Sequence, residues 1–147
     1  MACGQTHQSA PVTECYRFDQ AYFHWIWQPG RQLVVDSSAL IELRPTPMQP
    51  AWSLAPGERT PLEVRIPGMV EDSVLTAMRE GASFWRPLSA DSIEVWWYDG
   101  LSGPTFRLAR RGDSLVGMME FKTDVGGELP VRRPAAAARV RCVHETP

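Results

Sequence analysis

Two of the three cysteines stand at opposite ends of the strand-forming part of the chain, and their chemistry is a disulfide. Cys15 opens the first predicted strand and Cys142 ends the last one. In a closed up-and-down barrel the first and last strands are neighbours, so we expect Cys15 and Cys142 to be joined. A loop of this length would give about 5 kcal/mol of stabilisation in the chain-entropy model. Two unrelated thiols are the alternative.

The remaining cysteine, Cys3, lies in a polar N-terminal stretch that predicts a flexible tether over residues 1–13. Met1-Ala2-Cys3-Gly4 and the polar residues after it resemble the start of mature bacterial lipoproteins, in which a lipidated cysteine precedes a linker. The resemblance implies a lipid on Cys3, membrane association and a place in the bacterial cell envelope or periplasm. It also requires an upstream signal that has been removed. An ordinary N-terminus with a free thiol, in a cytoplasmic protein, is the alternative.

No other reactive side chain stands in a spacing that predicts catalysis or metal binding. His7, His24 and His144 lack metal-ligand spacing, and the sequence has no CxxC, HExxH, GxSxG or phosphate-loop motif. We therefore predict no catalytic residue, no metal and no cofactor. An enzyme on a barrel scaffold is the third hypothesis, after a ligand-binding barrel and a structural or interaction domain.

Aromatic residues are the remaining signal, and in a barrel they would line the interior. They either surround a cavity for a small apolar ligand or fill a core that has none. Gly117 lies on a strand face that otherwise carries bulky apolar side chains. Its missing side chain leaves a gap that a ligand or a neighbouring side chain would occupy. The predicted ligand-binding residues are Trp25, Trp27, Trp85, Trp97, Phe106, Gly117 and Met119.

The elements that must position these residues centre on residues 92–125, which predict three antiparallel strands joined by two turns. Gly112-Asp113 suits a two-residue hairpin turn, which sets Arg111 opposite Ser114 and Leu108 opposite Gly117. Residues 99–104 are dense in turn formers, and a turn there puts Trp97 opposite Phe106.

This pairing gathers one apolar face across all three strands, made of Ile93, Val95, Trp97, Phe106, Leu108, Leu115, Met119 and Phe121. The other face mixes charged and apolar residues, and Trp96 is expected opposite Arg107 as a cation–π pair. A face of this kind is partly covered or binds a partner, because a face in water would be more polar.

The rest of the chain predicts further short strands, over residues 14–27, 39–44, 61–66, 83–86 and 135–143. Glu71–Glu80 is a helix candidate with acids at its start, and a strand is the competing interpretation. The predicted fold class is all-β, an antiparallel up-and-down barrel or a strongly curved meander sheet with one short helix. Residues 14–147 would form a single domain.

Composition narrows the classes of partner. The chain has 147 residues, with 15 Lys and Arg against 17 Asp and Glu, a net charge of −2. This balance argues against nucleic acid, which requires a basic stripe. No apolar run reaches the length of a membrane-spanning helix.

The hairpin FRLARRGDSLVGMMEF, within residues 92–125, resembles those of lipocalin-like (calycin) barrels. The resemblance implies a small barrel with a hydrophobic ligand inside. Our leading hypothesis is thus an exported small β-barrel that binds a small hydrophobic ligand. The alternative is a structural or interaction domain of the cell envelope with a filled core.

Overall fold

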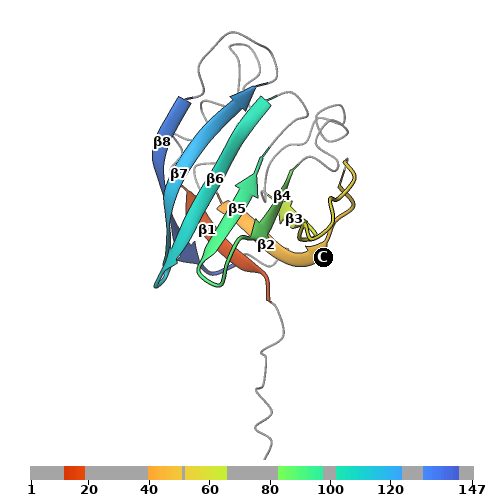
Figure 1. Ribbon diagram of the computed structural model, residues 1–147. Helices are drawn as coiled ribbons and strands as arrows, with labels where there is room; N and C mark the ends of the chain where they lie inside the picture. Colours follow the sequence, from red (N-terminus) through yellow and green to blue (C-terminus); the bar gives the residue numbers. More distant parts are fainter. Residues whose placement is uncertain are drawn as a thin grey trace, which may run out of the picture.

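The structure is a computed structural model, and it describes residues 12–18, 40–50, 52–65, 83–97, 102–123 and 131–142. Its eight strands form one closed antiparallel barrel (Figure 1). The strands are β1 (Glu14–Phe18), β2 (Leu40–Pro47), β3 (Leu62–Arg65), β4 (Phe84–Pro87), β5 (Ser92–Trp96), β6 (Ser102–Arg111), β7 (Ser114–Thr123) and β8 (Val131–Val140).

Each strand pairs with its neighbour in sequence, and β1 pairs with β8 to close the sheet. The predicted all-β, up-and-down barrel is therefore confirmed. The alanine-rich stretch near the C-terminus is a strand, as alternation predicted, although β8 starts earlier, at Val131. The helix candidate Glu71–Glu80 lies outside the described residues, as does the N-terminal tether up to residue 11.

The hairpin of β6 and β7 has the predicted register. Arg111 pairs with Ser114 and Leu108 with Gly117, and the pairing continues to the far ends of both strands. Gly112 has φ 59°, the left-handed conformation that a two-residue turn requires of its first residue. The tight turn fixes the register, because it leaves no freedom for the strands to slide.

The predicted register between β5 and β6 is wrong by two residues. Val95, not Trp97, pairs with Phe106, and the backbone N–H of Trp97 donates to the carbonyl of Pro104 at 3.0 Å. A shift of two keeps every side chain on its predicted face, so hydrophobic alternation could not detect it. Arg107 consequently pairs with Glu94, and the expected pair between Trp96 and Arg107 is replaced by Trp96 opposite Thr105.

The core fills the inside of the barrel with side chains from the inner face of every strand. The apolar face predicted for the central strands is this inner face, and Phe106, Val95 and Leu115 on it have no exposed surface. Phe18 and Phe106 meet edge to face across the interior, with ring centroids 5.1 Å apart. Leu62 and Val64 of β3 pack against the same cluster.

The outer face of β4 and β5 is covered, which explains its mixed composition. Phe84 stacks on Trp96 with centroids 5.6 Å apart, and Trp52, from the irregular stretch after β2, packs on Phe84 at 5.0 Å. Arg86 lies beside this stack, paired with Glu94 at 3.0 Å and with Glu58 at 2.9 Å. The stretch between β2 and β3 is thus held against the barrel wall by aromatic stacking and by a charged network.

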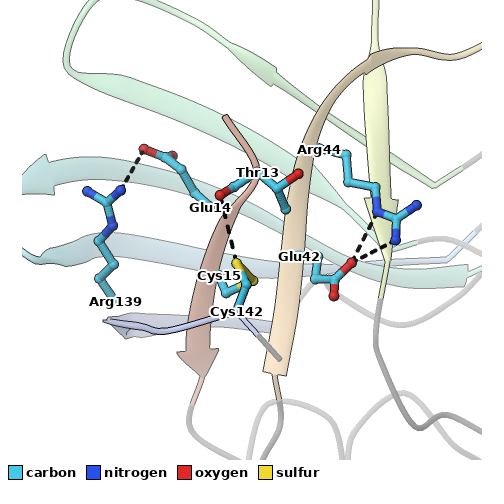
Figure 2. Close-up of a disulfide and its surroundings, with 7 residues drawn as sticks. All are labelled: Thr13, Glu14, Cys15, Glu42, Arg44, Arg139 and Cys142. Atoms are coloured by element: carbon cyan, nitrogen blue, oxygen red, sulfur yellow. Dashed lines mark hydrogen bonds and ion pairs between the residues drawn. A yellow bond between two sulfur atoms is a disulfide. The ribbon is translucent and has the colours of Figure 1, made fainter. Parts of the chain in front are cut away.

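The barrel closure carries the predicted disulfide, between Cys15 and Cys142, with Cα atoms 5.2 Å apart (Figure 2). Cys15 lies on the outer face, between its cross-strand partners Glu42 of β2 and Val140 of β8. The Cys142 sulfur is 3.8 Å from the carbonyl oxygen of Thr13. The bond therefore joins the start of β1 to the end of β8, the two strands whose pairing makes the sheet a barrel.

Replacing both cysteines, in Cys15→Ala/Cys142→Ala, should lower the free energy of unfolding by up to about 5 kcal/mol, because the unfolded chain would lose a long covalent loop. Urea unfolding measures the change. In the unfolded, unreduced and unlipidated wild type, thiol titration should find one free cysteine. Three free thiols, or equal urea midpoints for the two proteins, would contradict the disulfide.

Candidate binding site in the barrel interior

The two ends of the barrel are built differently. One, here called the disulfide end, holds Cys15–Cys142, the turn at Gly112 and the short turn between β4 and β5. At the other, the far end, β1 and β5 finish and β2 and β8 begin. The segments that join strands there, residues 19–39, 66–82, 98–101 and 124–130, lie outside the described residues.

A polar cluster closes the interior at the disulfide end. The Nη1 of Arg110 lies 2.8 Å from Oε2 of Glu14 and donates to the hydroxyl oxygen of Tyr16 at 3.1 Å. Arg139 approaches the same Glu14 carboxylate at 3.9 Å, as Figure 2 shows. Arg110 reaches from β6 across the interior to β1, and Arg139 joins β1 from its neighbour β8, so the cluster acts as a plug.

The plug shifts the ionisation of its own members. Burial raises the pKa of Tyr16, the negative charge of Glu14 raises it further, and Arg110 and Arg139 oppose the shift. For Arg110, burial lowers the pKa, but the hydrogen bond and charge of Glu14 outweigh it and the net shift is upward. At neutral pH Arg110 is therefore charged and the phenol of Tyr16 is neutral.

Four of the predicted ligand-binding residues are brought together on the inner face. Trp85, Trp97, Phe106 and Met119 belong to one buried cluster. Trp97 directly follows β5 at the far end, and the indole N–H of Trp85 donates to the carbonyl of Arg44 at 2.8 Å. Trp25 and Trp27 lie outside the described residues, as does Cys3.

Gly117 also lies on the inner face, but the space beside it is taken by backbone. A Cβ built at Gly117 would collide with the carbonyl oxygen of Arg107 and would lie 3.0 Å from Cα of Leu108. The glycine is therefore explained by the close approach of β6 to β7. The expected gap, for a ligand or a neighbouring side chain, is absent at this position.

A surface pocket of about 230 Å³ lies outside the barrel, lined by Glu58, Arg59, Arg86, Pro87 and Leu88. Its charges already have partners. Glu58 accepts from Arg86 and from the backbone N–H of Ala55, so its pKa lies below the ordinary value, and Arg59 donates to the carbonyl of Pro87. No motif in the sequence predicts this pocket.

The described residues contain no group of three His, Cys, Asp or Glu that could hold a metal ion. The three histidines lie outside this part of the chain. Within the same residues, no helix is both long and apolar enough to cross a membrane.

Comparison with known proteins returned no matching family model, curated protein or solved structure. The closed eight-stranded antiparallel barrel is compatible with the architecture of lipocalin-like barrels.

Substituting Gly117 with Ala should lower the free energy of unfolding by about 3 kcal/mol or more, because the new Cβ forces β6 and β7 apart. Urea unfolding followed by circular dichroism measures it. Val116→Ala, on the exposed neighbouring position, is the control and should change stability by no more than about 0.5 kcal/mol. Equal stability of Gly117→Ala and wild type would refute the close approach.

Tyr16→Phe should remove the hydrogen bond with Arg110 and cost about 1 kcal/mol at neutral pH. Because the folded-state pKa of Tyr16 is raised above 10.0, its contribution is complete below that pH and is lost as the pH rises through the folded-state pKa. The stability of wild type should thus fall more steeply than that of Tyr16→Phe above about pH 10. Urea midpoints across this range test it, and parallel curves would contradict it.

Proposed function

We propose that the protein is an exported small β-barrel that binds a small hydrophobic ligand in its interior, entering from the far end. Eight-stranded barrels have interiors just wide enough to be filled by side chains or to hold one small ligand. The buried cluster inside this barrel is apolar, with the plug at the disulfide end and Arg133, half-buried on the inner face of β8, toward the far end. An apolar ligand is the class that such a wall favours.

The difference between the two ends carries the proposal. The disulfide end is sealed by tight turns and by the Glu14–Arg110 pair. Toward the far end the inner face presents large, polarisable side chains, namely Phe18, Trp97, Phe106 and Met119. Aromatic rings and a methionine adapt to apolar ligands of varied shape, so this half of the interior supports a binding site.

Export and anchoring are part of the same proposal. Disulfides form and persist in oxidising compartments, and the Cys15–Cys142 bond supports a place in the bacterial cell envelope or periplasm. A lipid on Cys3 would hold the barrel to a membrane through the tether. Mass spectrometry of protein purified from its own host would detect both the lipid and a bound ligand.

Ligand binding can be tested by introducing one larger side chain on the inner face of the barrel. Ala135 is buried on the inner face of β8 and pairs with Gly117, whereas Ala136 is exposed on the outer face. We expect wild type and Ala136→Leu to enhance the fluorescence of N-phenyl-1-naphthylamine, an uncharged probe, and oleate to displace it. Ala135→Leu should lose the binding and keep its fold, because the added side chain occupies ligand space.

A core without a ligand site would give a different result. In a filled core Ala135→Leu costs about 1–3 kcal/mol by overpacking. A wild type that binds no probe, together with an Ala135→Leu destabilised by this amount and a normal Ala136→Leu, would refute the ligand proposal.

A second candidate is the interaction domain with a filled core. Met118 and Val116, 47% and 41% exposed on the outer face of β7, favour it, because large apolar side chains there are available to a partner. The fluorescence experiment distinguishes the two candidates.

A further inference from the structure

The outer face of β6, β7 and β8, side by side in Figure 1, has an exposed apolar centre. Cross-strand pairing joins Val116 to Ala136 and Met118 to Pro134, and Ala138 follows on the same face of β8. All five are exposed. Alanine and proline give a flat surface around the two larger side chains, Val116 and Met118.

Arginines surround this centre. Arg107 pairs with Met118 across β6 and β7, Arg111 with Ser114, and Arg17 of β1 with Ala138. All three are exposed, and none forms an ion pair with another described residue. We call the five apolar residues and these three arginines the arginine-rimmed face.

The described carboxylates near this face form no ion pair with its arginines. Glu120 is paired with Arg132 at 3.2 Å. Glu94, opposite Arg107, is buried and accepts from Arg86 and from the indole of Trp96. Asp113 is exposed at the tip of the hairpin. Within the described part of a chain of net charge −2, three arginines without an ion pair thus surround an apolar patch.

We propose that the arginine-rimmed face docks on an anionic lipid surface. Guanidinium groups bind phosphate oxygens in a bidentate manner, and the rim places three of them around side chains that enter the headgroup layer. A protein partner is less well matched, because the face has no aromatic anchor and the described pocket lies elsewhere. A second copy would set like charges against each other.

The magnitude of the effect follows from the charges. A basic side chain near an anionic membrane contributes about 1 kcal/mol, which corresponds to about a five-fold change in partitioning. Three such residues would favour anionic over neutral vesicles about a hundred-fold, and screening by salt would reduce this preference.

The experiment uses the full chain without a lipid on Cys3, sedimented with vesicles of phosphatidylcholine alone or mixed with phosphatidylglycerol. We expect binding to the anionic vesicles only. Arg107→Gln should weaken it about five-fold and Arg17→Gln/Arg107→Gln/Arg111→Gln about a hundred-fold. Arg59→Gln, in the stretch between β2 and β3 and outside the arginine-rimmed face, removes the same charge and should leave the binding unchanged.

Three results would overturn the proposal. The first is equal binding to both vesicle types or to neither. The second is a loss with Arg59→Gln as large as that with Arg107→Gln, which would indicate a response to net charge alone. The third is a concentration-dependent dimer that Met118→Ser abolishes, which would assign the face to a second copy.

Discussion

The pairing of β1 with β8 is the interaction on which the rest of the structure depends. It covers four residues of β1, from Cys15 opposite Val140 to Phe18 opposite Ala137, and joins parts of the chain with the greatest separation in sequence. Without it both strands would be open edges, and the apolar inner face would have no enclosed side. A short pairing that closes so long a loop is costly in entropy, and the disulfide reduces that cost by constraining the unfolded chain.

The plug reinforces the same junction from inside. Glu14 stands one residue from Cys15 on the opposite face of β1, so the covalent bond lies outside the barrel and the ion pairs lie within it. Arg110 contacts Glu14 across the interior from the end of β6, where the β5–β6 register sets Ile93 opposite Leu108 and leaves Arg110 beyond the start of β5.

The features of the fold that the sequence predicted are those that the alternation of apolar and polar residues along a strand determines. Face assignment, strand type and the β6–β7 register were accessible, since period two and a tight turn at Gly112 determine them. The β5–β6 register was not, because an even shift preserves the faces. The role of Gly117 could not be predicted either. Alternation shows that a side chain is missing there, but it cannot show that the Arg107 carbonyl approaches the glycine. The stacking of Trp52 on Phe84 depends on how an irregular stretch folds back.

The candidate site likewise combines strand residues, whose faces the sequence predicted, with connections, whose folding it did not. With Gly117 assigned to strand contact, and the Phe18–Phe106 pair spanning the interior, the ligand site that we propose would lie between that pair and the far end. Trp97 lies at that end, and Trp25 and Trp27 belong to the segment that joins β1 to β2 there. The strands thus supply the rigid floor and wall, while the connections supply the residues that differ most freely between proteins of one architecture. At the proposed site, ligand specificity would therefore depend on the connections, whereas the disulfide and the ion pairs that stabilise the barrel lie at the disulfide end.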